Sequence, residues 1–207
     1  MNILIVYAHP EERSFNAAMR RTAETALRAL GHNIMVSDLY RDRFRAWPEP
    51  ADFPARANPA HFELMREQAH ANATGAVATD VAREQARVAW ADSILLQFPM
   101  WWWSFPAILK GWVDRVLSNG FAYGDRDLAP RSAMLCLTAE TKAKRFAGNG
   151  AERLLEHMAR GTLGYCGLKL LPHFAVPEVL TIGDDERALK LDQFSAHLQA
   201  HFSQALP

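Results

Sequence analysis

The 207-residue sequence has few cysteines, no excess of either charge and no long apolar run. Its two cysteines, Cys136 and Cys166, lie far apart and form neither a CxxC pair nor a zinc-ligand spacing, so we expect two reduced, buried thiols. Lys and Arg number 23 and Asp and Glu also 23. A net charge of zero argues against general electrostatic binding to nucleic acid or to an anionic membrane.

Membrane and targeting segments are also missing from the sequence. No run approaches the roughly 20 apolar residues that are needed to span a bilayer. Residues 1–7 lack the basic region and the cleavage site of a signal peptide and look instead like a first strand. We therefore expect a cytoplasmic location. The sequence contains neither GxGxxG nor GxxxxGK[ST], which excludes the usual dinucleotide fingerprint and the P-loop.

The apolar residues, 49% of the chain, are arranged as strands that alternate with helices. Strands are predicted at 2–7, 33–37, 93–98 and 132–138, with an interrupted fifth strand at 168–171 and 174–176. Helices are predicted at 14–30, 79–91, 106–117, 151–165 and 184–202, and a short polar one at 61–72. This alternation is typical of an α/β fold with a parallel sheet and helices on both faces. We interpret residues 1–207 as a single domain with a long, irregular excursion at about 38–78, which covers either a site or a partner subunit.

The most unusual stretch is residues 97–106, with the sequence Gln-Phe-Pro-Met-Trp-Trp-Trp-Ser-Phe-Pro. It follows a predicted buried strand and precedes a helix that Pro106 can start. Ligands of α/β proteins bind at the carboxyl ends of strands, and a flat ligand needs an aromatic wall. We therefore predict that this loop forms the wall of a flavin site. The alternative is that the tryptophans make only a core or dimer contact.

The first loop, after the strand at 2–7, lies where a nucleotide phosphate would bind in such a fold. Ser14 is a good N-cap for the following helix, whose first N–H groups favour an anion. His9, Ser14 and Asn16 offer an imidazole, a hydroxyl and an amide as further donors. Alternatively, Ser14 is only a cap and His9 only a histidine that ends a strand.

Four segments together carry a family resemblance. They are Ala8-His9 with Ser14-Phe15-Asn16, Asp38-Leu39-Tyr40, the block from Gln97-Phe98-Pro99 to Pro106-Ala107-Ile108-Leu109-Lys110-Gly111-Trp112, and Phe121-Ala122-Tyr123. With these segments the chain resembles the NAD(P)H quinone oxidoreductases over nearly its whole length. The resemblance implies a flavodoxin-like three-layer sandwich with a five-stranded parallel sheet in the order 2-1-3-4-5.

The resemblance also implies a tightly held flavin and assigns residues to it. On the phosphate side are His9, Ser14, Phe15, Asn16 and Ala17. On the side of the isoalloxazine ring are Pro99, Met100, Trp102 and Trp103, and Thr138 and Ala139 start the loop that borders the ring. Trp101 is also among the cofactor-binding candidates. Family members are homodimers with the active site at the subunit interface, so Tyr123 and Trp101 are expected to serve the neighbouring subunit's site.

The activity implied by the resemblance is two-electron reduction of a quinone or similar electrophile by NAD(P)H. In this ping-pong cycle, hydride passes to the flavin, the nicotinamide leaves, and the acceptor takes the hydride from the same face. FAD is favoured because residues 38–78 and the tryptophans resemble the FAD-binding branch, with FMN as the alternative. Another reading is an ancillary subunit of a potassium efflux system. A flavodoxin-type electron carrier is less favoured because such carriers are strongly acidic.

The sequence departs from this family after the strand at 132–138. Many relatives have Thr-Thr-Gly-Gly there, followed by a tyrosine and a histidine that stabilise charge on the flavin, whereas residues 137–142 read Leu-Thr-Ala-Glu-Thr-Lys. Phe146 stands in for the tyrosine without its hydroxyl, and His157 is poorly placed for the histidine. Lys142 or Lys144 is another source of positive charge. No catalytic residue is assigned beyond the candidates Tyr123 and Phe146, no metal site is predicted, and the choice between NADH and NADPH stays open.

Overall fold

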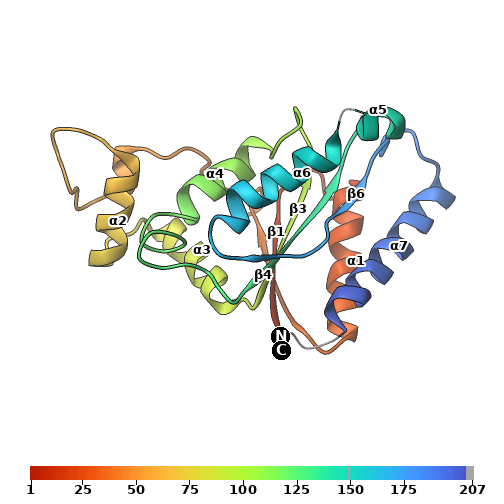
Figure 1. Ribbon diagram of the computed structural model, residues 1–207, viewed down its shortest axis with the longest axis horizontal. Helices are drawn as coiled ribbons and strands as arrows, with labels where there is room; N and C mark the ends of the chain where they lie inside the picture. Colours follow the sequence, from red (N-terminus) through yellow and green to blue (C-terminus); the bar gives the residue numbers. More distant parts are fainter. Residues whose placement is uncertain (149, 204–207) are drawn as a thin grey trace.

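The computed structural model describes residues 1–148 and 150–203 and is built around one parallel sheet (Figure 1). Its strands are β1 (Asn2–Tyr7), β2 (Asn33–Asp38), β3 (Ser93–Pro99), β4 (Ser132–Thr138), β5 (Lys169–Leu170) and β6 (Phe174–Val176). The order is β2-β1-β3-β4, and both β5 and β6 pair with β4. The predicted order 2-1-3-4-5 is confirmed, with two short strands in the fifth position. Pro172 lies between them and has no N–H to donate to a ladder.

Helices cover both faces of the sheet and make the three layers visible in Figure 1. They are α1 (Phe15–Ala29), α2 (Leu64–Thr74), α3 (Thr79–Trp90), α4 (Ala107–Val116), α5 (Ala143–Gly148), α6 (Ala151–Ala159) and α7 (Asp184–Phe202), with a 3-10 turn at Pro50–Asp52 and a π-helical turn at Arg160–Gly164. Helices α3, α4 and α6 share one buried apolar cluster, with Val88 and Trp112 among its members. Helices α1 and α7 share the other, with Leu27 and Phe194. Since both faces are covered, β3 and β4 are buried along their whole length.

Two predicted segments are wrong in detail. Residues 139–150, for which no helix was predicted, contain α5, which forms because its Phe146 is buried against Trp103, with ring centroids 6.1 Å apart. The helix predicted at 151–165 stops at Ala159 and continues as the π-helical turn, where the Thr162 hydroxyl donates to the Met158 carbonyl. Packing between distant segments decides both features, and a local pattern does not contain that information.

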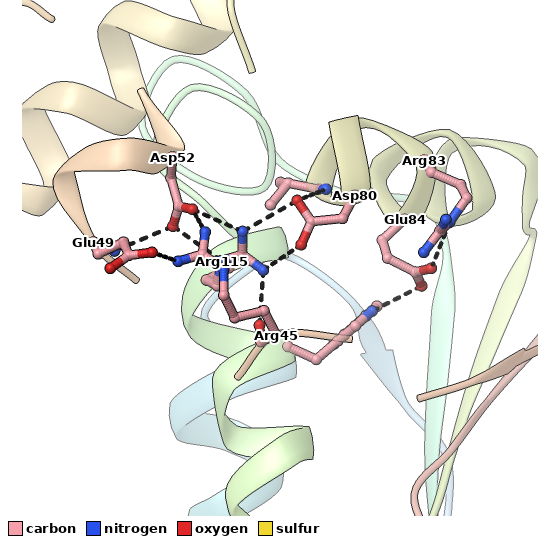
Figure 2. Close-up of polar contacts among 9 residues, drawn as sticks. Arg45, Glu49, Asp52, Asp80, Arg83, Glu84 and Arg115 are labelled. Atoms are coloured by element: carbon pink, nitrogen blue, oxygen red, sulfur yellow. Dashed lines mark hydrogen bonds and ion pairs between the residues drawn. The ribbon is translucent and has the colours of Figure 1, made fainter. Parts of the chain in front are cut away.

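The excursion at 38–78 packs beside α3 and α4, on the side of the molecule away from α1 and α7 (Figure 1). Arg115 of α4, which is 3% exposed, holds it in place (Figure 2). The guanidinium donates to both carboxylate oxygens of Asp52, at 3.1 and 3.0 Å, and to the Arg45 carbonyl at 2.7 Å. It also donates to Asp80 at the start of α3. The excursion is therefore an ordered part of the fold.

Cys136 and Cys166 are free and buried, as predicted, and burial raises the pKa of the Cys166 thiol to about 11. Among the helices of the described residues, none has both the length and the hydrophobicity that a membrane crossing requires.

Candidate functional site

A cavity of about 320 Å³ opens at the carboxyl edge of the sheet, beyond β1, β3 and β4. This is the edge at which doubly wound sheets bind their ligands. Its lining residues are His9, Arg13, Ser14, Phe15, Asn16, Pro99, Met100, Trp101, Thr138, Ala139, Glu140, Val179, Leu180 and Arg187. All the predicted cofactor-binding residues except Ala17, Trp102 and Trp103 are in this lining. The fold therefore brings the first loop and the tryptophan loop to one site.

His9 is poised as a hydrogen-bond donor. Its Nδ1 accepts from the Glu11 N–H at 3.0 Å, so the proton of the neutral ring sits on Nε2. Burial lowers the pKa of His9, which keeps the ring neutral near pH 7. His9 can thus donate from Nε2 to a ligand oxygen in the cavity without carrying a charge.

The start of α1 presents backbone donors to the same cavity. Ser14 is the N-cap, as predicted, and its Oγ accepts from the Ala17 N–H at 3.1 Å. Ala17 is fully buried, so its part in the site is this capping bond. Within residues 1–148 and 150–203, no protein acceptor takes the N–H groups of Phe15 and Asn16. Two free N–H groups at the positive end of a helix favour an anion such as a phosphate.

Two arginines that the sequence analysis missed add positive charge to this end of the cavity. Arg187, in the first turn of α7, donates from Nε to the Ile182 carbonyl at 3.1 Å and from Nη2 to the Val179 carbonyl at 2.6 Å. Its guanidinium lies 5.5 Å from the centroid of the Phe15 ring. Arg13 is 92% exposed and paired with Glu11. The packing of α7 beside α1 brings Arg187 to the site, and no nearby sequence pattern predicts this.

The tryptophan loop is a tight turn with an unusual backbone. Trp101 and Ser104 exchange two backbone hydrogen bonds, at 3.2 and 3.0 Å, around Trp102 and Trp103. Both central residues have positive φ, 49° and 59°, as in a type I′ turn. Bulky residues rarely adopt this conformation, and strain of this kind clusters at functional sites.

This turn sends the three tryptophans in different directions. Trp101 lines the cavity and is 37% exposed, Trp102 is 97% exposed, and Trp103 stacks on Phe146 at an interplanar angle of 20°. The sequence favoured Trp102 and Trp103 for the flavin and Trp101 for the acceptor or the dimer. Within one subunit, the structure instead places Trp101 beside Pro99 and Met100 on the cavity wall. A role of Trp102 and Trp103 in flavin binding stays a prediction.

The side chain of Asn16 is already bonded within the protein. Its Oδ1 accepts from Gln97 Nε2 at 2.6 Å, and its Nδ2 donates to Thr138 Oγ1 at 2.6 Å. The amide predicted to bind a phosphate therefore holds β3 and β4 against α1, and Asn16 faces the ligand with its backbone N–H. The backbone N–H of Ala139 already donates to the Val176 carbonyl, so Ala139 helps to form the cavity wall but offers no backbone donor to a ligand.

The catalytic candidates lie outside the lining of the cavity. Tyr123 pairs with Tyr165, with ring centroids 5.4 Å apart, beside a second cavity of about 440 Å³. Phe146 is buried against the tryptophan loop, and His157, Lys142 and Lys144 are exposed. In the described part of the chain, no group of three or more His, Cys, Asp or Glu side chains is arranged to hold a metal.

The lining fits a flavin nucleotide. One end combines the free N–H groups of α1, the Nε2 donor of His9 and the Arg187 guanidinium, which suits phosphate. The other end has the apolar surfaces of Pro99, Met100 and Trp101, which suit a flat ring.

Comparison with known proteins agrees with this geometry. The model of a family described as having a flavodoxin-like fold matches residues 1–202. Ribosyldihydronicotinamide dehydrogenase [quinone] of Rattus norvegicus is 37% identical, covering 96% of this chain and 90% of that protein. NAD(P)H dehydrogenase [quinone] 1 of the same species is 31% identical, covering 95% and 76%.

A solved structure shows the same arrangement of the chain. NAD(P)H:quinone oxidoreductase from Methanothermobacter marburgensis superposes with a TM-score of 0.80 at 26% identity, covering 97% of both chains. The order of the sheet, the cavity at its carboxyl edge and the match over residues 1–202 lead to one assignment. The chain belongs to the flavodoxin-like fold family, in the branch that contains the quinone-reducing dehydrogenases.

Proposed function

We propose that this protein is a flavin-dependent NAD(P)H:quinone oxidoreductase. The observation that carries the proposal is the continuous lining of the cavity, which joins an anion-binding end at the start of α1 to an aromatic wall at the end of β3. The names of the relatives support the same reaction. They give no support to a role in potassium efflux.

The protein's part in this reaction is binding and orientation. A bound flavin supplies the hydride chemistry, accepting from a reduced nicotinamide and giving to a quinone. The N–H groups of Phe15 and Asn16, with His9 and Arg187, would hold the phosphate end and so orient the flavin. Met100 and Trp101 would shield one side of the ring from water. No side chain is needed as a nucleophile.

FAD is the proposed flavin, with FMN as the alternative. Leu180 is 67% exposed and lines the same cavity as Arg187. This apolar side chain offers a place for an adenine, which FMN lacks. Releasing the flavin from the purified protein and chromatographing it distinguishes the two.

The reductant is proposed to be NADH or NADPH. Several relatives are named for ribosyldihydronicotinamide, which lacks the adenosine phosphates, so it is the second candidate. Steady-state assays with the three reductants and menadione as the acceptor rank them. A quinone-like acceptor of flat shape is expected because the wall at Trp101 is flat and apolar.

We also propose a cytoplasmic homodimer. Trp102 is 97% exposed, and the cavity beside Tyr123 is bordered by the exposed side chains of Met65 and Tyr165. A second copy that covers these surfaces would bring Tyr123 near the neighbour's site. Light scattering is expected to give twice the mass of the chain, and Trp102→Ala is expected to raise the dissociation constant of the dimer. A monomer at micromolar concentration would contradict this part of the proposal.

The central test is the absorbance spectrum of the purified protein. We expect visible flavin bands, directly or after reconstitution with FAD, and their bleaching by NAD(P)H followed by recovery with menadione. If no flavin binds, the proposed function is wrong. If flavin binds but no reductant bleaches it, the protein is a flavin carrier of another kind.

A further inference from the structure

We propose that Gln97 is a positioning residue that acts through Asn16 to aim the hydroxyl of Thr138 into the cavity as a hydrogen-bond donor. This inference rests on the proposed flavin function, which supplies the acceptor. Gln97 is 1% exposed and is not in the lining of the cavity, whereas Asn16 and Thr138 are. Its influence on a ligand must therefore pass through these two neighbours.

The orientation of the Gln97 amide, next to Met19, determines which group donates at each hydrogen bond from Gln97 through Asn16 to Thr138. Gln97 Nε2 lies 2.6 Å from Asn16 Oδ1 and 3.8 Å from the Met19 sulfur. A thioether sulfur can only accept, so the amide nitrogen of Gln97, rather than its oxygen, must face Met19. The same NH₂ group then donates to Asn16 Oδ1. This leaves Asn16 with its Nδ2 toward Thr138, at 2.6 Å from Oγ1.

The hydroxyl oxygen of Thr138 consequently accepts a hydrogen bond from Asn16, and the hydroxyl keeps its own O–H to donate to another acceptor. Among the described residues, no hydrogen bond has this hydroxyl as its donor. Thr138 is 2% exposed, and its side chain borders the cavity where β4 ends. A buried hydroxyl that still has a proton to donate needs an acceptor, and the ligand in the cavity is the group that can supply one.

A donor at this position distinguishes between the two redox states of a flavin. Reduction increases the electron density on the oxygen and nitrogen acceptors of the ring, so a hydrogen bond from Thr138 stabilises the reduced form more than the oxidised form. The chain Gln97–Asn16–Thr138 thus contributes part of the charge stabilisation for which this sequence has no tyrosine–histidine pair.

The test measures the dissociation constants of oxidised and reduced FAD in a double-mutant cycle. Gln97→Met removes the inner donor and lets the Asn16 amide turn, so that its Oδ1 accepts a hydrogen bond from the Thr138 hydroxyl. Thr138→Val removes the hydroxyl at nearly constant shape. Each variant is expected to lower the preference for reduced over oxidised FAD about 3- to 10-fold, the range for one net hydrogen bond. Thr138→Ser is expected to restore the preference.

The double variant decides between positioning and a merely structural role. If Gln97 acts through Thr138, then Gln97→Met produces no further change in the Thr138→Val background. A matched control is Ser93→Ala, which breaks another buried bond between β3 and β4, from Ser132 Oγ to Ser93 Oγ at 2.9 Å, at the opposite ends of the strands. It is expected to lower the stability without changing the preference.

Three outcomes would overturn the proposal. They are an unchanged preference in Gln97→Met, additive effects in the double variant, and a change in Ser93→Ala as large as in Gln97→Met. In all three the wild type still binds FAD and the proposed function stands. A wild-type protein that binds no flavin overturns the proposed function together with this inference.

Discussion

The two arginines at the cavity differ in how firmly the protein holds them. Two backbone carbonyls and the Phe15 ring fix Arg187, whereas Arg13 is 92% exposed and paired with Glu11. A fixed guanidinium loses little freedom when it binds a phosphate, while an exposed one must become ordered and is screened by solvent. Burial and existing hydrogen bonds therefore make Arg187, rather than Arg13, the arginine that contributes to phosphate binding.

We predict that Arg187→Met weakens binding of FMN or FAD by at least about tenfold, because a hydrogen bond to a charged group contributes about 1.5–3 kcal/mol. Arg13→Met is the matched control and should change the affinity by about threefold or less. Riboflavin, which has no phosphate, should bind both variants like the wild type. An equal loss of riboflavin affinity in Arg187→Met would mean that the arginine only supports the 179–182 segment.

The neighbouring tryptophans allow a similar comparison within one turn. Trp101→Ala should weaken flavin binding about tenfold or more, since an aromatic side chain contributes about 1.5–3 kcal/mol when a ligand covers it. Trp102→Ala should change the affinity less, because this side chain is exposed and outside the cavity lining of its own subunit. Fluorescence titration of proteins in the same oligomeric state measures both. A larger loss in Trp102→Ala would favour the original assignment of that residue to the ring.

At the scale of elements, the contact between α4 and the excursion depends on a glycine. A Cβ atom built on Gly111 would lie 1.8 Å from the Ala46 carbonyl oxygen, so the backbone of the excursion occupies the space of a side chain. Gly111→Ala should therefore lower the free energy of unfolding by about 1–3 kcal/mol or more, through forced separation of the two segments.

Gly148 in α5 is the control for that prediction. A Cβ atom there meets nothing within 4 Å, so Gly148→Ala should be neutral or stabilise the protein by about 0.4–1 kcal/mol. Urea denaturation measures both variants. If Gly111→Ala were as stable as Gly148→Ala, the close approach of Ala46 would be wrong.

The elements differ in how far the sequence predicts them. The strands and the main helices follow from apolar runs, caps and glycines, and the residues around His9 and Trp101 already pointed to a flavin. Helix α5 did not follow, because its stability comes from the stack of Phe146 on Trp103. The directions of the three tryptophans could not be predicted either, since positive φ at two bulky residues runs against their local preference.

The same limit applies to the site as a whole. Arg187 is far along the chain from residues 9–16 and reaches them through the packing of α7 against α1. The bonds from Asn16 to Gln97 and Thr138 join three different elements. Sequence patterns report on neighbours within one element, so they predicted residues at the cavity and not the side-chain network between them.

On the scale of the whole molecule, polar groups lie at both flanks of the sheet. On the α3–α4 side, burial acts to raise the pKa of Asp80, but the Arg115 guanidinium outweighs it and the pKa lies below its usual value. On the α7 side, burial lowers the pKa of His197, and the nearby His201 and His173 lower it further. Asp80 therefore loses its stabilising charge only in strong acid, whereas the protonation of His197 affects stability nearer to neutral pH.

The free energy of unfolding should therefore decrease as the pH is lowered from about 7.5 to about 5.5, before the carboxylates are protonated. The unfolded chain binds a proton at His197 more tightly than the folded chain, because the folded pKa is the lower one. Full stability is present above the unfolded pKa, about 6.5, and is lost progressively as the pH falls below it. His9, whose pKa burial also lowers, contributes with the same sign.

The measurement is the urea midpoint at several pH values for the wild type and for His197→Gln. The glutamine amide can replace the bond from His197 Nε2 to the Pro172 carbonyl, 2.9 Å long, but it does not titrate. The variant should match the wild type near pH 7.5 and lose less stability toward pH ~5.5. An unchanged slope would show that His197 has the same pKa in the folded and unfolded states, and that the acid sensitivity arises at His9 or elsewhere.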